Sequence, residues 1–230
     1  MEETHETLIR PKTVTEFQAM FSFIYGKKNS MWYSDEDLVR RLLEVICSLM
    51  EHARKDRRSE FEKEIPHVFS WYCALANRLG INLQEALWRK YPGVCSYCVR
   101  ESNCSCGVEH PVIPDKETTL RRLRRERDGR EPHTLRAHQE LHGRLYGKQN
   151  ERIFPIQVAA HLAEEAGEVS KALRYGNTES VSAEMADVAS WMFALVIRLD
   201  LPPIDELVWK MYPHECPACH QIQCACLEKL

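Results

Sequence analysis

Two short blocks of cysteine, one near the middle of the chain and one at its end, are the feature that most limits how this sequence can fold. The first block is Cys95, Cys98, Cys104 and Cys106, and the second is Cys216, Cys219, Cys224 and Cys226. Four thiolates so close in sequence suit a tetrahedral zinc ion, whereas disulfides within such short loops would be strained. We therefore expect two structural zinc ions per chain. The remaining Cys47 and Cys73 lie in apolar stretches and are expected to be buried.

The two blocks are the ends of a tandem repeat. A shift of the chain by 121 residues against itself aligns many identical residues, and a one-residue slip continues the match between them. Examples of aligned pairs are Tyr25 with Tyr146, Trp71 with Trp191, Tyr91 with Tyr212 and Cys95 with Cys216. The sequence therefore predicts an N-terminal tail at 1–12, a first repeat at 13–106, a linker at 107–133 and a second repeat at 134–230.

Apolar residues at helical spacing predict an all-α fold. In the second repeat, Val158, Leu162, Val169 and Leu173 form the stripe of an amphipathic helix over 155–175. Similar spacing predicts helices over 134–146, 179–199 and 204–211, and neither repeat shows a strand pattern. Short connections favour antiparallel neighbours, so we expect two tandem helical bundles, each ending in a four-cysteine zinc knuckle.

Charge and hydropathy limit the partners. The formal net charge is -3, which gives no general attraction to nucleic acid, and the longest apolar run, Trp191 to Ile197, is too short to span a bilayer. The first residues lack the apolar core of a signal peptide, so a cytoplasmic protein that does not bind membranes is expected. The linker carries six arginines between Thr118 and Arg130. A solvated helix with local ion pairs and a phosphate-binding patch are both open interpretations there.

Five carboxylates of the second repeat lie on two consecutive predicted helices. Glu164, Glu165 and Glu168 occupy the first, and Glu184 and Asp187 occupy the second. If the helices pack antiparallel, these groups converge, and their mutual repulsion calls for a cation; oxygen ligands at this charge density suit Mg²⁺ or Mn²⁺. The alternative is a solvated face neutralised by ordinary surface pairs.

The segments Glu164-Glu-Ala-Gly-Glu168 and Glu184-Met-Ala-Asp187 resemble the EExxE...ExxD signature of the MazG-like, all-α nucleoside triphosphate pyrophosphohydrolases. The resemblance covers the helical part of each repeat and neither the cysteine tails nor the linker. It implies cleavage of a ribo- or deoxynucleoside triphosphate to the monophosphate and pyrophosphate, with those five carboxylates as the magnesium site. Glu164 or Glu165 is then the base.

Substrate contacts are implied less directly. Lys148 and Lys210 are candidates for the phosphates, and Gln139 and Asn150 for the nucleoside. The alternative is that these residues are exposed polar positions shared by both repeats.

The first repeat departs from the signature. Leu43, Glu44 and Cys47 stand where Glu164, Glu165 and Glu168 are, and Glu64 and His67 stand where Glu184 and Asp187 are. These are too few oxygen ligands for Mg²⁺, so the first repeat is expected to be catalytically silent, with His67 packed or hydrogen-bonded.

Members of the resembled family are dimers with pockets between protomers. The first repeat could therefore form one wall of the second repeat's pocket, and two chains would make a homodimer equivalent to a tetramer. Two other interpretations remain at this stage: a non-catalytic nucleotide-binding or adaptor protein on the same scaffold, and a zinc-dependent hydrolase.

Overall fold

The structure is a computed structural model that describes residues 9–106 and 114–226. Residues 1–8 of the predicted tail, 107–113 of the predicted linker and the last four of the second repeat lie outside the described residues. Within the described part the secondary structure is helical, without strands, which confirms the all-α prediction. The helices are α1 (Val14–Trp32), α2 (Asp35–Arg54), α3 (Arg58–Leu79), α4 (Leu83–Lys90), α5 (Lys116–Arg127), α6 (Leu135–Asn150), α7 (Pro155–Arg174), α8 (Thr178–Arg198) and α9 (Ile204–Met211).

Local sequence signals set the helix ends. Thr13 caps α1 in a capping box with Glu16, and Ser34 does the same for α2 with Asp37. Pro155 is the first residue of α7, where its missing N–H costs nothing. Gly176 follows α7 with a φ of 65°, a left-handed conformation that glycine adopts without a steric penalty. The predicted helices of the second repeat are thus confirmed to within a few residues.

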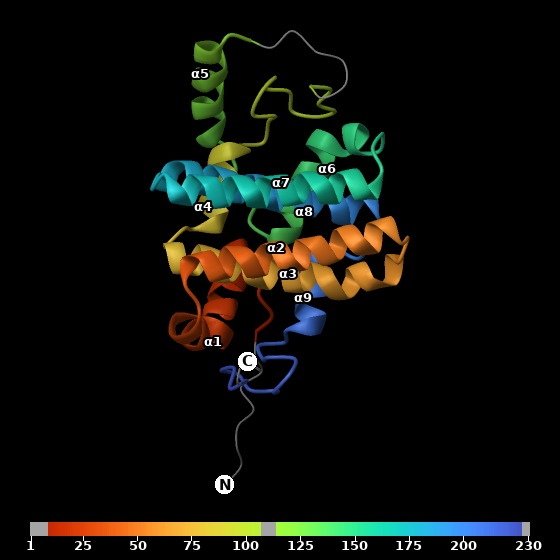
Figure 1. Cartoon of the computed structure of the whole chain (residues 1–230). Coiled ribbons are helices and arrows are strands. Elements are labelled where there is room, and N and C mark those ends of the chain that lie inside the picture. Colours follow the sequence, from red (N-terminus) through yellow and green to blue (C-terminus); the bar gives the residue numbers. More distant parts are fainter. Residues whose placement is uncertain (1–8, 107–113, 227–230) are drawn as a thin grey trace.

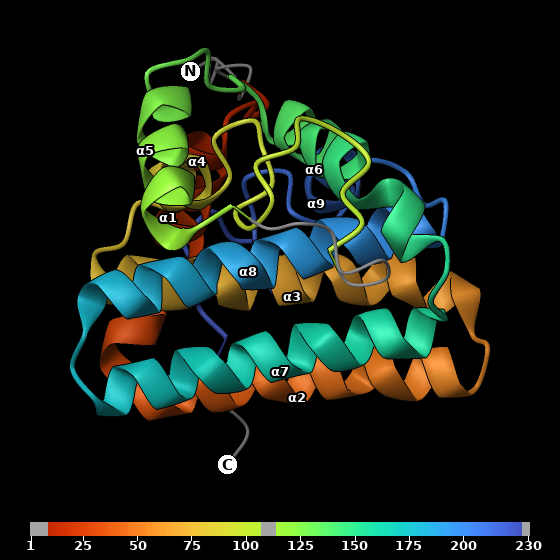
Figure 2. The same ribbon diagram turned by 90° about the horizontal axis from the view of Figure 1, so that it is seen from above.

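Four long helices make the centre of the molecule. The hairpin of α2 and α3 forms one layer and the hairpin of α7 and α8 forms another, with α7 over α2 and α8 over α3 (Figures 1 and 2). The buried side chains of both layers join in one continuous hydrophobic core, to which the first repeat contributes Phe69 and Tyr72 and the second Phe193. Because the two repeats share this core, neither buries its own apolar faces alone.

The short fourth helix of each repeat crosses to the other repeat. Helix α4 packs on α8, and α9 packs on α3. Each cysteine knuckle follows its helix across: the Cys104 N–H donates to the Leu145 carbonyl of α6 at 2.7 Å, and the Cys224 N–H donates to the Ile24 carbonyl of α1 at 2.8 Å. Figure 1 accordingly shows the two knuckles at opposite ends of the layered stack. The tails are therefore exchanged between the repeats rather than closing on their own.

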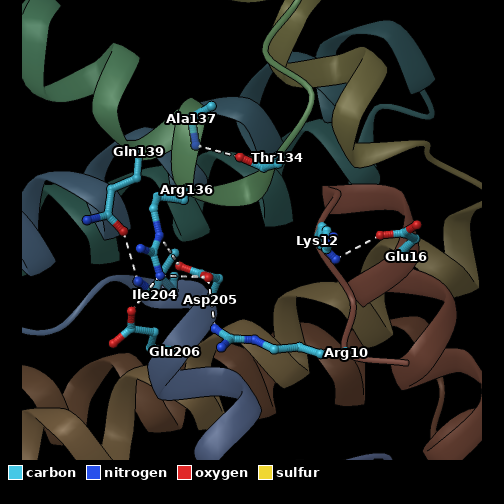
Figure 3. Close-up of polar contacts among 10 residues, drawn as sticks. All are labelled: Arg10, Lys12, Glu16, Thr134, Arg136, Ala137, Gln139, Ile204, Asp205 and Glu206. Carbon is cyan, nitrogen blue, oxygen red and sulfur yellow. Dashed lines mark hydrogen bonds and ion pairs between the residues drawn. The ribbon is translucent and has the colours of Figure 1, made fainter. Parts of the chain in front are cut away.

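Equivalent glutamines of the two repeats hold the starts of these crossing helices. Gln139 of α6 accepts a hydrogen bond from the Ile204 N–H of α9 at 2.9 Å, and Gln18 of α1 accepts one from the Leu83 N–H of α4 at 3.1 Å. Asp205, beside Ile204, pairs with Arg136 of α6 and with Arg10 from the start of the chain (Figure 3).

Helix α8 is long and apolar enough to cross a membrane by length and composition alone. More than half of that stretch (56%) is buried inside the fold, as is usual for the core helix of a bundle.

Two other expectations of the sequence meet different outcomes. Cys73 is buried as predicted, but the prediction for Cys47 was wrong, because it lies on the outer face of α2 beside the inward-facing Ile46.

In the linker, α5 is an arginine-rich helix whose arginines are mostly exposed. It is anchored by Leu123, which packs with Val94 and Val99 next to the first knuckle.

Candidate functional site

Three of the five predicted carboxylates meet between α7 and α8. Glu165, Glu184 and Asp187 each offer an oxygen, and these oxygens lie within 4.8 Å of one another. They meet because the α7–α8 hairpin is antiparallel and each residue borders the buried stripe of its helix. Three converging carboxylates have the donor chemistry of a divalent, oxygen-preferring cation.

The other two carboxylates have their own partners outside this cluster. Glu164 points away with a side chain that is 66% exposed and pairs with His161 at 3.1 Å. Glu168 pairs with Lys171 one turn along α7 at 3.2 Å. In this arrangement the site has three carboxylates, and the two outer ones form ordinary surface pairs.

The first repeat supplies the groups that face the cluster from the other side. Lys90, at the end of α4, forms an ion pair with Asp187 and lies 3.3 Å from the Ala183 carbonyl. The Tyr91 hydroxyl donates a hydrogen bond to the other oxygen of Asp187. These contacts follow from the crossing of α4 onto α8. They agree with the expectation that the first repeat forms one wall of the second repeat's site.

Burial and crowding change how the carboxylates titrate. Burial, followed by the neighbouring Asp187, raises the pKa of Glu165 to about 7, although the Trp191 indole N–H donates to it at 3.2 Å and opposes the shift. Burial also raises the pKa of Glu184, and here the Lys90 ammonium works in the opposite direction. A cation bound among the three groups must therefore displace a proton from Glu165 near neutral pH.

This raised pKa predicts a pH-dependent stability. Glu165 holds a proton in the folded chain between its unfolded pKa near 4.5 and its folded pKa near 7, so its stabilising effect is complete below the unfolded value and is lost as the pH rises through the folded one. Between pH 4.5 and 7.5 we expect the free energy of unfolding without Mg²⁺ to fall by about 1 kcal/mol, a figure reduced because the side chain is partly exposed.

The measurement is urea unfolding of the wild type and of Glu165→Gln at several pH values without added divalent cation. The difference between the two removes the contributions of other titrating groups. A difference that does not change between pH 4.5 and 7.5 would contradict the assignment.

A cavity of about 380 Å³ opens over the acidic cluster. Its floor includes Glu165 and Asp187, and its walls come from both repeats. The wall residues are Tyr91, Cys95, Ser96, Tyr97, Cys104, Cys106, Tyr146, Gln149, Asn150, Ser190, Trp191 and Ala194. Gln149 Oε1 is buried there without a hydrogen-bond partner among the residues that the structure describes. The cavity thus combines aromatic walls and an acidic floor, with the unpaired amide oxygen of Gln149 buried behind its surface.

The predicted substrate contacts have different positions relative to this cavity. Asn150 lines it, as expected of a nucleoside contact. Gln139 is instead occupied by the Ile204 N–H at the start of α9. Lys148 is exposed and does not line the cavity, and Lys210 belongs to α9, which packs on the first repeat's α3. Of the four residues, the structure brings only Asn150 to the cavity.

Both cysteine blocks have the geometry of structural zinc sites. The four sulfurs of each block all lie within 4.8 Å of one another. Sγ of Cys98 is 3.7 Å from that of Cys104, and Sγ of Cys216 is 3.8 Å from that of Cys226. A tetrahedron with zinc–sulfur bonds of about 2.3 Å has edges of about 3.8 Å, so these spacings fit zinc and are too long for disulfides.

One thiol of the second knuckle, that of Cys219, is more acidic than a free cysteine. Backbone N–H groups of Ala225 and Gln221 lower the pKa of the Cys219 thiol to about 6, which favours the deprotonated form that binds zinc.

The first repeat does not assemble a comparable acidic cluster among the described residues. Glu44 pairs with Arg41 on the surface, and Glu64 lies 4.0 Å from His52. His67, at the place of Asp187, has its Nδ1 2.6 Å from the Tyr212 hydroxyl of the second repeat. His67 is therefore a hydrogen-bonded, partly buried histidine, as the sequence suggested.

Lys90 and Tyr91 are functional candidates that the sequence analysis missed. The sequence held a hint of the role of Tyr91, because Tyr91 aligns with Tyr212 in the repeat, whereas Lys90 aligns with Met211 and gave no such hint.

Comparisons with protein-family models, curated proteins and solved structures found no match for this chain.

Proposed function

We propose that this protein is a Mg²⁺-dependent nucleoside triphosphate pyrophosphohydrolase of the MazG-like type, with its catalytic site in the second repeat. The observation that carries the proposal is the cluster of Glu165, Glu184 and Asp187, of which Glu165 and Asp187 line an aromatic-walled cavity. The donor set fits a hard divalent cation because three carboxylate oxygens converge. Glu165, with a pKa of about 7, is also able to give up its proton to such a cation near neutral pH.

Bound Mg²⁺ would offset the charge that develops on the leaving pyrophosphate. The chain's own groups divide the remaining tasks. Trp191, Tyr146 and Tyr97 offer faces and edges against which a base can stack. The water-excluding cover is the first knuckle, through Cys95, Cys104 and Cys106.

Glu165 is the group that we assign as the base. It lines the cavity, whereas Glu164 lies outside it and pairs with His161. Its carboxylate is fixed by the Trp191 indole N–H, which gives it a defined position for accepting a proton from an attacking water. Because Trp191 also stacks on His161 at 4.4 Å, the orientation of this base is set by packing.

Lys90 acts as the internal counter-ion of the metal-free site. Replacing it with methionine, the residue at the equivalent place in the second repeat, leaves Asp187 without its cation and is expected to destabilise the metal-free protein by about 2 kcal/mol. Mg²⁺ should restore most of this loss, because it neutralises the same carboxylates. Thermal unfolding without Mg²⁺ and with about 50 mM Mg²⁺ measures both effects, because a concentration about fifty times the Kd of a millimolar site stabilises the folded state by about 2 kcal/mol.

The matched control is Lys210→Met, on the exposed face of α9. It should change the midpoint little under either condition. Equal destabilisation of the Lys90 variant with and without Mg²⁺ would contradict the counter-ion role.

The activity is tested by pyrophosphate release from a panel of ribo- and deoxynucleoside triphosphates with Mg²⁺. Release of pyrophosphate rather than phosphate, absent from Glu165→Gln, supports the proposal. Silence across the panel by folded, zinc-loaded protein argues against it. If the silent protein still binds nucleotides in a Mg²⁺-dependent way, the adaptor interpretation replaces it, and the acidic cluster serves binding alone.

The tail exchange bears on assembly. One chain already places parts of both repeats around one cavity, as two protomers do in the resembled family. We keep the sequence-based proposal that two chains associate as a homodimer. Sedimentation equilibrium tests it, and a fully active monomer would rule it out.

A further inference from the structure

A second cavity, of about 290 Å³, lies at the opposite end of the molecule. Its walls are built from α1 and α3 of the first repeat and from the knuckle of the second. They comprise Tyr25, Lys28, Asn29, His67, Ser70, Trp71, Ala74, Tyr212, Cys216, Pro217, Ala218, Cys224 and Cys226. Its volume is near the lower end, about 300 Å³, of the usual range for small-molecule sites.

This cavity matches the acidic one residue by residue. Under the repeat shift, the aromatic residues Tyr25, Trp71 and Tyr212 correspond to Tyr146, Trp191 and Tyr91, and Asn29, Ser70 and Ala74 correspond to Asn150, Ser190 and Ala194. The tail exchange brings the opposite knuckle over each cavity. The first repeat therefore lacks the acidic cluster but has a pocket with the same two tyrosines, tryptophan and asparagine in its walls, while Ala218 stands at the place of Tyr97.

Outside the knuckles, the two linings carry different charges. Glu165 and Asp187 line the acidic cavity, whereas no carboxylate lines the second one, and Lys28 stands there at the place of Gln149. Within the part of the chain that the structure describes, Lys28 has no carboxylate at ion-pairing distance. His67 replaces Asp187 and is bonded to Tyr212, and burial lowers the pKa of His67, so it is neutral at pH 7. Compared with the acidic cavity, such a lining lacks the carboxylates that hold a divalent cation and offers an anion a cationic contact at Lys28.

We propose that the cavity of the first repeat binds a nucleoside monophosphate without a divalent cation, with the phosphate at Lys28 and the base between the aromatic walls. The choice of a nucleotide rests on the proposed function, because Tyr25 and Trp71 stand where Tyr146 and Trp191 are proposed to hold the base in the acidic cavity. The preference for a single anionic group rests on the second cavity alone. Each chain then has two nucleotide sites, of which one hydrolyses its ligand.

The test is calorimetric titration of full-length, zinc-loaded protein, in buffer without Mg²⁺, with nucleoside 5′-monophosphates, the matching nucleosides and inorganic phosphate. At least one monophosphate should bind at one equivalent per chain. Lys28→Ala should weaken the affinity for this monophosphate about tenfold, since a charge-assisted contact is lost. The matching nucleoside should bind to the wild type as weakly as the monophosphate binds to Lys28→Ala. Lys28 is partly exposed, so its replacement does not endanger folding.

Gln149→Ala, at the equivalent position of the acidic cavity, is the matched control and should leave this affinity unchanged. In protein labelled with 5-fluorotryptophan, the ligand should move the fluorine resonance assigned through Trp71→Phe and not the one assigned through Trp191→Phe. The inference is overturned if no monophosphate binds, if nucleosides bind equally well, or if binding depends on Gln149 and moves the Trp191 resonance. None of these measurements requires turnover. A protein that binds the monophosphate but hydrolyses no nucleoside triphosphate would therefore contradict the proposed function and not this inference.

Discussion

Asp187→Asn is expected to lower the rate of pyrophosphate release at least about a hundredfold, because Asp187 joins all parts of the proposed site. It shares the acidic cluster with Glu165 and Glu184, and it holds Lys90 and Tyr91 of the first repeat. The amide removes one negative charge from the cation site and cannot accept the same pair of charge-assisted contacts. Rate assays at saturating nucleotide should show the lower rate, and calorimetric titration with Mg²⁺ should show weaker binding of the cation.

Glu164→Gln is the informative comparison. The sequence signature gives Glu164 the same role as Glu165, but the structure turns it outward to His161. Its replacement should change the rate by less than about threefold. In the first repeat, Glu64→Gln, at the place of Glu184, should have no effect on the rate. A loss at Glu164 as large as that at Asp187 would show that the site needs the outer carboxylates, contrary to the arrangement described above.

Loss of either zinc site is the second large effect that we expect. Cys98→Ser and Cys219→Ser occupy equivalent places in the two knuckles, and each should remove one zinc equivalent per chain. Structural zinc binds peptides with about 10–16 kcal/mol, and detaching one tail should cost at least about 3 kcal/mol of the free energy of unfolding. The cost reaches both repeats, because each knuckle is hydrogen-bonded to a helix of the other, at Leu145 or Ile24.

The two variants should differ in activity. The first knuckle forms a wall of the acidic cavity through Cys95, Cys104 and Cys106, so Cys98→Ser should lose pyrophosphate release even where the chain remains folded. Cys219→Ser should lose stability but keep the rate at low temperature. Zinc content, urea unfolding and rate assays measure these outcomes side by side. Equal activity losses in both variants would contradict the assignment of the catalytic cavity to the first knuckle.

Local patterns in the sequence were sufficient for the helices and for the two four-cysteine clusters. Helical periodicity, Pro155 at the start of α7 and Gly176 after it act within a few residues, so helix limits could be predicted closely. The cysteines of each knuckle are also neighbours in sequence, and a tetrahedral site within one short loop has few alternatives. The repeat itself is visible as identity at a fixed shift.

The membership of the site was beyond those patterns. Helix periodicity puts Glu164, Glu165 and Glu168 near one another but does not say which of them faces α8, because a rotation of α7 by a fraction of a turn changes the answer. The packing of α7 against α2 fixes that rotation and selects Glu165. The prediction that Cys47 is buried was wrong for the same reason, since the sequence did not say which face of α2 points inward, and Cys47 lies next to the buried Ile46.

What the sequence by itself determined was therefore the all-α class, the duplication, the two four-cysteine clusters and the pair of helices that carry the carboxylates. Only the tertiary structure decided that the tails cross between the repeats, that Lys90 and Tyr91 complete the acidic site and that Lys210 and Gln139 lie elsewhere. The physical reason is range. Helix and turn propensities act over a few residues, whereas the partner of α4 is chosen by burial of its apolar face on a helix about ninety residues further along the chain.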